Sequence, residues 1–575
     1  MRRRYWISLF IFLIFAALVT WLWWVRPKQV NMAAYAPADS MLYLEANQPL
    51  EIAETIYGTG AWKAFGNFLG TPVSGRRSPE LQRFIRWTGV GPIESVILAR
   101  AQIAVVITDM GTTEQGDTLR IRPEGAVLVE THTSERRIRA PVEQAIKTFA
   151  EKTYGQPILR RTTLDGVELL EWSAPTDSRQ IVGAIIGSLV ILGNSEHAVQ
   201  NCVAVSLGRR ESLKDDPELT RVRRQLGVER PLTFGYVPAG KSARLLAVGI
   251  PVLLDRAPGD SEFQRFITAG AEKIFGSVGW TSSAYSTGIE DRYLIALQPS
   301  VVTRLKPNFD SAYNSNFQIE HLLPNDVYSV TSYRFSNPAA TWQSLKTAVS
   351  SQVDALSTIV FSSLLKSSLL SYGINDPEVF LDAVDGELLT LRFDDNGERS
   401  VLIAGMRDSS TLRQILTKKM GLIPRTNNYS QTESFEDSRE EVAAVFISNL
   451  IVLGSPADVR RYAINKQGNT ESSVEKIKRM TFFVPLSSSA NIVTYTDDSN
   501  RVRSFISAII VASGRAAVPA VRMEEGLASL PFSVTETTLD DPGIKRITKS
   551  PLGQFSSVLP LLIPEPPGLT QPGSR

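Results

Sequence analysis

An uninterrupted apolar stretch, Tyr5–Val25, is the feature of this 575-residue sequence that most constrains its fold. Its twenty-one residues include no charged residue and no proline. A helix of that length, rising about 1.5 Å per residue, spans a hydrocarbon core of about 30 Å. The sequence therefore predicts one transmembrane helix at residues 5–25, followed by a large water-exposed part.

The flanks of this stretch predict its orientation. Basic residues crowd its start and tryptophans its end: Arg2, Arg3 and Arg4; Trp21, Trp23 and Trp24. Basic residues favour the cytoplasmic side, and indole rings favour the headgroup layer. We therefore expect an uncleaved signal anchor in the inner (plasma) membrane, with residues 1–4 as a cytoplasmic tip and the bulk periplasmic or extracellular. A signal peptide cleaved near Ala34-Tyr35-Ala36, or an N-terminal helix packed in a soluble core, are the alternatives.

The charge balance argues against nucleic acid as a partner. Five of the 61 basic residues and none of the 59 acidic residues lie within residues 1–30, so the rest of the chain has a formal net charge of −3. This balance leaves no electrostatic footprint for a polyanion. The single cysteine, Cys202, excludes an internal disulfide but says nothing about the compartment.

An internal repeat predicts two copies of one fold. Ile186, Leu189, Leu192 and Gly193 match Ile447, Leu450, Leu453 and Gly454 at one constant spacing, and weaker matches along the chain keep the same order. Asn-Gly, Gly-Ser and Asp-Gly turns between apolar runs predict hairpins, and helical patterns lie between them. We therefore expect an α+β protein of two duplicated domains, residues 35–300 and 320–555, built of hairpins and helices around largely antiparallel sheets. Proline and glycine in residues 560–575 predict a disordered tail.

This order of parts resembles a bacterial family of membrane-anchored envelope proteins known only as a domain of unknown function. The residues that carry the resemblance are the anchor, Pro37-Ala38-Asp39 with its strand, the Leu192-Gly193 and Leu453-Gly454 units, and Ser550-Pro551-Leu552-Gly553. It covers most of residues 35–555. The resemblance implies a place in the envelope and no particular activity.

The residues that usually perform chemistry are scarce and scattered. The three histidines are His132, His197 and His321, and the spacing of His197 and Cys202 on one helix gives a poor metal chelate. We therefore predict no catalytic, cofactor-binding or metal site, and interpret Cys202 as a buried core residue. Asp39 and Asp326 recur before a strand in both copies and are interpreted as turn residues, with a catalytic pair across the copies as the alternative. In residues 134–154, the pattern places Ile138, Val142, Ala145 and Phe149 on one helical face.

Two function classes follow from these observations. The first is a binding or scaffolding module of the cell envelope that is not an enzyme, anchored in the lipid bilayer through residues 5–25, with an envelope protein or an apolar ligand as partner. The alternative is an extracytoplasmic hydrolase that depends on carboxylates alone. That enzyme needs two carboxylates about 5–9.5 Å apart in one cleft.

Overall fold

The structure is a computed structural model. It describes residues 29–69, 97–115, 118–176, 178–245, 268, 270–309, 322–324, 326–352, 365–425, 433–465, 478–480, 482–483, 490–513 and 518–562. The predicted tip 1–4, the predicted anchor 5–25 with its flanking arginines and tryptophans, and residues 563–575 of the predicted tail lie outside this part. Among the residues described, no helix is both long and apolar enough to cross a membrane. Residues 560–562 belong to helix α20 (Phe555–Leu562).

The first half of the described chain alternates hairpins with helices. Its strands are β1 (Leu42–Ala46), β2 (Gln102–Gln115), β3 (Thr118–Glu130), β4 (Ile158–Leu164), β5 (Val167–Ser173), β6 (Gln180–Ile186), β7 (Leu189–Gly193), β8 (Thr233–Val237), β9 (Phe275–Tyr285) and β10 (Gly288–Leu297). Its helices are η1 (Met32–Tyr35), α2 (Pro49–Gly58), α3 (Gly60–Leu69), α6 (Glu135–Tyr154), α7 (Glu196–Ser206), η2 (Leu213–Asp215), α8 (Pro217–Leu226) and α11 (Pro299–Phe309).

The second half has the same alternation. Its strands are β11 (Ser329–Arg334), β12 (Val384–Arg392), β13 (Ser400–Met406), β14 (Ile423–Arg425), β15 (Ser434–Glu436), β16 (Ala443–Ile447), β17 (Leu450–Gly454), β18 (Ile492–Thr496), β19 (Ser533–Asp540) and β20 (Gly543–Ser550). Its helices are α12 (Pro338–Ser350), α14 (Pro377–Asp382), α15 (Ser409–Gln414), the π-turn η4 (Ile415–Lys419), α16 (Pro456–Asn465), α18 (Ser499–Ser513), α19 (Ala520–Ala528) and α20.

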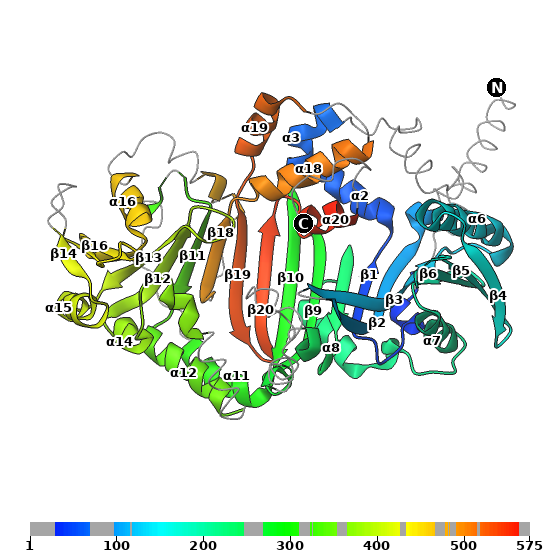
Figure 1. Ribbon diagram of the computed structural model, residues 1–575, viewed down its shortest axis with the longest axis horizontal. Coiled ribbons are helices and arrows are strands. Elements are labelled where there is room, and N and C mark those ends of the chain that lie inside the picture. Colours follow the sequence, from blue (N-terminus) through cyan, green and yellow to red (C-terminus); the bar gives the residue numbers. More distant parts are fainter. Residues whose placement is uncertain are drawn as a thin grey trace, which may run out of the picture.

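All these strands form one antiparallel sheet of 20 strands that runs the length of the molecule (Figure 1). The order in the first half is β4-β5-β6-β7-β3-β2-β1-β8-β9-β10. The order in the second half is β14-β15-β16-β17-β13-β12-β11-β18-β19-β20. The two orders are the same, and the halves join because β10 pairs with β20. The mixed helix and antiparallel sheet agree with the predicted α+β class, whereas the sequence did not predict that one sheet continues through both halves.

Short turns set the register of the predicted hairpins. β6 and β7 meet with Ile186 opposite Leu189, around Gly187, which has a φ of 61°. β16 and β17 meet in the same way, with Ile447 opposite Leu450. Glycine adopts a positive φ at little cost, so the Gly-Ser turn closes this hairpin in two residues.

Gly193 and Gly454 occupy like surroundings in the two halves. Each is the last residue of its strand and is paired with the neighbouring strand, Gly193 with Ala126 of β3 and Gly454 with Val401 of β13. A Cβ on Gly193 would lie 3.0 Å from the carbonyl oxygen of Gly125, and one on Gly454 would lie 2.7 Å from that of Ser400. The close backbone approach explains why both strands end in glycine.

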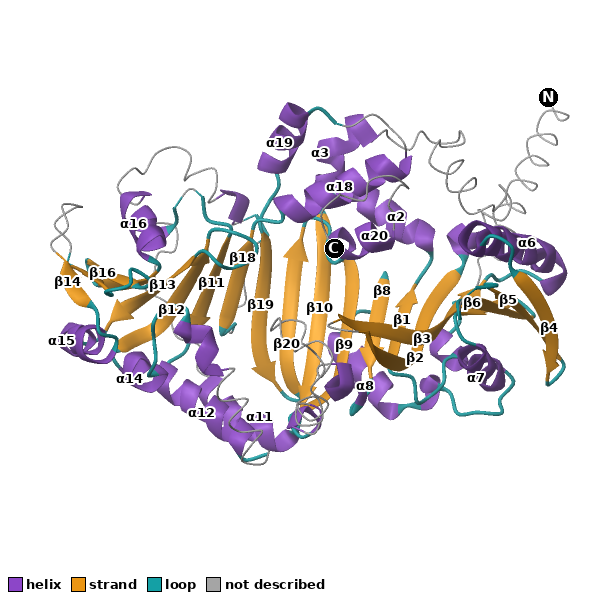
Figure 2. Ribbon diagram, viewed as in Figure 1, coloured by secondary structure: helices purple, strands orange, loops and turns teal. Residues whose placement is uncertain are grey.

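Helices cover both faces of the sheet (Figure 2). Alternate residues of β3 enter different cores: Leu128 packs with α7 and α8, and Val129 packs with α6. β13 does the same, with Val401 and Leu402 in separate cores. Side chains of a strand alternate between faces, so a sheet covered on both sides has continuous apolar strands.

One further core joins the two halves. Helices α2 and α3 of the first half lie together with α18, α19 and α20 of the second half above the middle of the sheet (Figure 1). Buried apolar side chains from both halves meet there: Trp62, Phe65, Phe505, Ile506, Leu527 and Phe555. The halves are therefore interlocked through helices as well as through β10 and β20.

Candidate binding site

An apolar groove lies between helix α6 and residues 97–98, which precede β2 in the chain. It has a volume of about 190 Å³, and its lining includes Ile97, Leu98, Ile138, Val142, Ala145 and Leu192. Strands β3 and β7 form its floor through Val129 and Val190. We call this space the α6 groove.

The α6 groove is formed by the helical face that the sequence predicts. Ile138, Val142 and Ala145 line it, and Phe149 follows one turn later with 48% of its surface exposed. The buried side chains of α6 are not the same set as the predicted apolar face. The helix packs most tightly on the sheet through Ile138, Ile146 and Ala150. The predicted face is therefore shared between the core and an open apolar strip.

The size of the α6 groove decides what it can hold. Sites for whole small-molecule ligands are usually about 300–1,000 Å³. A space of about 190 Å³ lined almost wholly by apolar atoms is smaller, and it suits one or two apolar side chains of a larger partner. Arg137 and Thr131 supply its polar rim.

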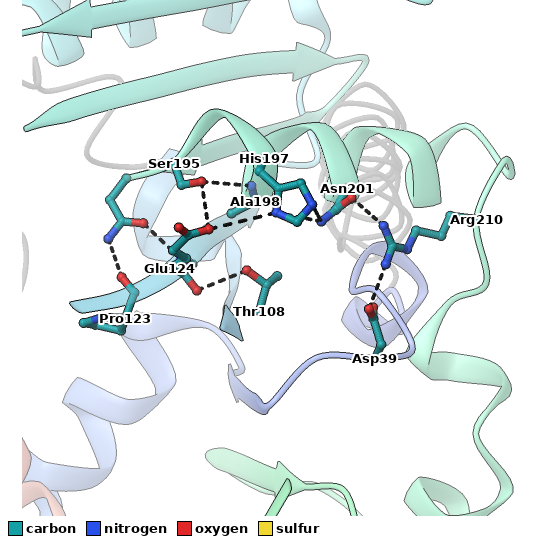
Figure 3. A network of polar contacts seen from close by, with 11 residues as sticks. Asp39, Thr108, Pro123, Glu124, Ser195, His197, Ala198, Asn201 and Arg210 are labelled. Carbon is teal, nitrogen blue, oxygen red and sulfur yellow. Dashed lines mark hydrogen bonds and ion pairs between the residues drawn. The ribbon is translucent and has the colours of Figure 1, made fainter. Parts of the chain in front are cut away.

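A polar network below the sheet holds residue types that could form a catalytic triad (Figure 3). The Ser195 hydroxyl, however, donates to Glu124 Oε2 at 3.1 Å and accepts from the backbone N–H of Ala198, as an N-cap of α7. His197 lies beside Glu124 at 4.0 Å and its side chain is 70% exposed, with its ring bonded to Asn201. No bond between Ser195 and His197 is found in this described network, so the serine has no base, and the group caps a helix.

The two repeated aspartates also have structural roles. Asp39 Oδ2 pairs with Arg210 at 2.8 Å, and Asp326 pairs with Arg461. In both halves the arginine follows or belongs to the helix that leaves the β6–β7 or β16–β17 hairpin. Six strands lie between β1 and β11 in the sheet, and seven spacings of about 4.8 Å place the two strands that follow these aspartates about 34 Å apart. They do not form a carboxylate pair.

Two other carboxylates are buried where the halves meet. Asp291 on β10 accepts a bond from Gln554 N at 2.9 Å and another from the Ser282 hydroxyl, and Asp498 precedes α18. Burial raises the pKa of both carboxyl groups to about 6. Neither side chain lines the α6 groove, and the bonds of Asp291 tie β9, β10 and the start of α20 together. We interpret these acids as part of the junction.

Metal ligands do not converge in the described residues, where no group of three His, Cys, Asp or Glu side chains could hold an ion. His132 lies 3.9 Å from Glu130, and His321 lies outside the described residues. The Asp394 carboxylate accepts bonds from the backbone N–H groups of Gly397 and Arg399, which closes the β12–β13 turn.

Cys202 lies on the buried side of α7, away from His197. Its side chain is fully buried in the core between α7 and the sheet, and burial raises the pKa of the thiol to about 12. Because the thiolate is the reactive form, a thiol of this kind is inert near neutral pH.

Cys202 is therefore expected to resist a thiol reagent in the native chain and to react after unfolding. Cys202→Ala is expected to cost about 1 kcal/mol of unfolding free energy, because one small buried group is lost. His197→Cys in the Cys202→Ala background is the matched control, since residue 197 is exposed on the same helix. Labelling of native wild type as fast as that control would show that Cys202 is accessible and reactive.

A second cavity was not predicted from the sequence. It has a volume of about 450 Å³ and lies beside the C-terminal end of α8, where Arg223, Arg224 and Arg230 line it. In the sequence, the basic residues Arg221, Arg223 and Arg224 could have indicated this cavity, but the net charge of the whole chain is near zero and does not draw attention to them. We call this space the arginine cavity.

Comparison with known proteins adds little to this geometry. No family model and no curated protein matches the chain. One solved structure, described as "Structure of crystal form I of TP0453", is 10% identical with a TM-score of 0.22, and the match covers 47% of this chain and 79% of that chain. A similarity this weak supports no conclusion about fold or function. The resemblance to the membrane-anchored envelope family stays a prediction.

Proposed function

We propose that this chain is a membrane-tethered binding or scaffolding protein of the bacterial cell envelope. Residues 5–25 anchor it in the inner membrane with the N-terminus in the cytoplasm, and the large sheet lies outside. Its α6 groove binds apolar side chains of an envelope protein. The α6 groove is the observation that carries the proposal, because it is an open apolar surface on a helix that is otherwise strongly polar.

The apolar strip favours binding over a purely structural role. Phe149 follows the groove-lining Ala145 by one helical turn and is about half exposed, although burial of a phenylalanine side chain is worth about 1.5–3 kcal/mol. Arg139 of α6 forms ion pairs within the helix and to the β4–β5 hairpin, with Glu135 at 2.6 Å and with Glu168 at 2.8 Å. These ion pairs keep one side of α6 hydrated and leave the groove side for a partner.

The rest of the described chain supports binding in preference to the hydrolase alternative. Glu45, which lines the arginine cavity, is held by Arg223 at 2.7 Å, and Glu135 of α6 is held by Arg139. A carboxylate bound to an arginine in this way is already occupied, whereas a glycosidase needs one protonated acid beside one free carboxylate. We therefore propose no hydrolytic activity.

We also propose that residues 35–300 and 320–555 are duplicated copies of one unit. The same strand order in both halves, the like surroundings of Gly193 and Gly454, and the Asp–Arg pairs of Asp39 and Asp326 support it. The copies join through β10 and β20, equivalent strands that meet as in a symmetric dimer.

The proposal is tested by cross-linking in cells. A photoreactive residue at position 149 of the full chain is expected to capture one envelope protein, because that position is exposed and lies one helical turn after Ala145, which lines the α6 groove. The same residue at position 144, which is exposed on the polar side of α6, is the matched control. Val142→Lys is expected to reduce capture at 149 to the level of that control, since it places a charge in the groove.

Two further experiments show which part of the proposal is wrong if the cross-linking result differs from this expectation. Removal of residues 1–28 is expected to weaken capture without unfolding the chain, because the tether raises the effective concentration near membrane partners. Cross-links from position 149 only to residues 70–96 of the same chain, or a fall in the unfolding temperature with Val142→Lys, would mean that the groove is an internal packing surface. Either result would overturn the proposal.

A further inference from the structure

The arginine cavity lies beside residues 29–31, which follow the predicted anchor in the sequence. Gln29, Val30 and Asn31 form one wall, the end of α8 and residues 228–231 form another, and strands β1, β2, β8 and β9 contribute Glu45, Gln102, Phe234 and Thr281. Val25, the last residue of the predicted anchor, is five residues before Val30. At about 3.5 Å per residue, this wall of the cavity is at most about 18 Å of chain from the predicted membrane surface.

A buried clamp keeps the chain at that place. The Gln102 side chain accepts from Val30 N at 2.7 Å and donates to Val30 O at 3.0 Å, so one amide holds both backbone groups. Gln102 also donates to Asn47 Oδ1 at 3.2 Å, and Asn47 donates to Pro231 O at 3.1 Å. Gln102 is 2% exposed. The clamp therefore joins Val30, β2 and the loop that bears Arg230 beside the predicted membrane exit.

The three arginines differ in how far they are already engaged. Arg223 donates to Glu45 Oε2 at 2.7 Å and lies over the Phe234 ring at 4.6 Å, so its charge is neutralised and its position is fixed. Arg224 and Arg230 are exposed, and neither has an ion-pair partner among the described residues. The carbonyl groups at the end of α8 are occupied by Arg292, which donates to Leu226 O at 3.0 Å. Two guanidinium groups therefore remain for a ligand, against one further acid, Glu229.

We propose that the arginine cavity binds the phosphate headgroup of an anionic membrane lipid. This inference rests on the proposed membrane anchoring, which places the cavity mouth at the bilayer. A guanidinium group presents its N–H donors in a fork that fits two phosphate oxygens. Basic residues close to an anionic membrane surface contribute about 1 kcal/mol each to attraction. Bound in this way, the lipid orients the sheet on the membrane through the clamp at Val30.

The test uses the full chain in a non-ionic detergent and three soluble probes. The probes are dihexanoyl phosphatidylglycerol, dihexanoyl phosphatidylcholine and inorganic phosphate, each titrated by calorimetry. We expect phosphatidylglycerol to bind at one site, and the other two probes to bind at least about tenfold more weakly. Arg224→Gln with Arg230→Gln is expected to lower the phosphatidylglycerol affinity by about tenfold or more. Its unfolding temperature should stay unchanged, because neither arginine has a partner among the residues described.

Arg221→Gln is the matched control, because Arg221 lies on the same helix, pairs with Glu218 and does not line the cavity. Its phosphatidylglycerol affinity should equal that of wild type. Equal binding of inorganic phosphate and phosphatidylglycerol would make the cavity a soluble-anion site, and unchanged binding by the double variant would place the lipid elsewhere. Both results overturn the headgroup inference. A wild-type chain found in the soluble fraction of cells would instead overturn the anchoring proposal.

Discussion

Gly235→Thr is expected to destabilise the fold by about 3 kcal/mol or more, measured as a loss of unfolding free energy in chemical denaturation. Gly235 is the middle residue of β8 and is paired with Trp280 on β9. A Cβ at position 235 would lie 2.1 Å from Cε2 and 2.2 Å from Cζ2 of the Trp280 indole, so the ring lies directly on the glycine backbone. Threonine needs that space, and either the indole or the strand must move.

The second half of the chain provides the design of a compensating variant. The strand pair equivalent to β8 and β9 is β18 and β19, where Thr494 is opposite Thr535. Gly235→Thr with Trp280→Thr copies that pair, so the double variant is expected to be less destabilised than the sum of the two single variants by about 2 kcal/mol. Gly66→Ala is the control, because no atom lies within 4 Å of a Cβ at that helical position. Additive effects of the two substitutions would mean that Trp280 does not require glycine at residue 235.

Local elements of this fold follow from the sequence because their causes are local. The Gly187-Ser188 turn closes its hairpin at the predicted place, since a two-residue turn depends on the φ values available to its own residues. Asn396-Gly397 also lies between two paired strands as predicted, but within a longer connection, because Arg392 is opposite Ser400. Burial of Cys202 follows from Val199 and Val203 on the same side of α7. The predicted face of α6 is likewise a matter of helical spacing.

The joining of the two halves could not be predicted in this way. Nothing in the sequences of β10 and β20 identifies them as partners, because the choice of partner depends on shape and on residues far apart in the chain. The α6 groove could not be predicted in full from the sequence for the same reason. The sequence places Ile138 and Val142 on one face of a helix, but whether that face is covered depends on Ile97, Leu98 and Val190, which only folding brings there. The arginine cavity depends on a clamp between Gln102 and Val30, 72 positions apart.

The two halves are expected to remain associated after the chain between them is cut. A protease site placed within residues 310–321, which join α11 to β11 and lie outside the described residues, leaves every strand intact. β10 pairs with β20 from Ile289 opposite Ser550 to Ala296 opposite Gly543, so separation would break a continuous ladder and expose two long edges. The cut chain should therefore elute from a sizing column as one species.

Separated halves are expected not to refold alone, because the core above the sheet belongs to both. Phe65 of α3 is fully buried, and a Cβ on Gly526 of α19 would lie 2.5 Å from its ring, so the two helices are in direct contact. Without the second half, Asp291 also loses its bond from Gln554 N and remains a buried carboxylate with fewer partners.

The measurement is to unfold the cut chain, separate the two pieces, and follow refolding of each piece and of the mixture by circular dichroism. We expect cooperative refolding of the mixture and none of either piece. In the uncut chain, Phe65→Ala weakens the core shared by the two halves without removing it. It is expected to lower the free energy of unfolding by about 3–5 kcal/mol. Two pieces that part in native buffer and each unfold cooperatively would show that the copies are independent domains. If both pieces are required, the two halves behave like the subunits of a symmetric dimer that are covalently linked, with stability residing in the interface.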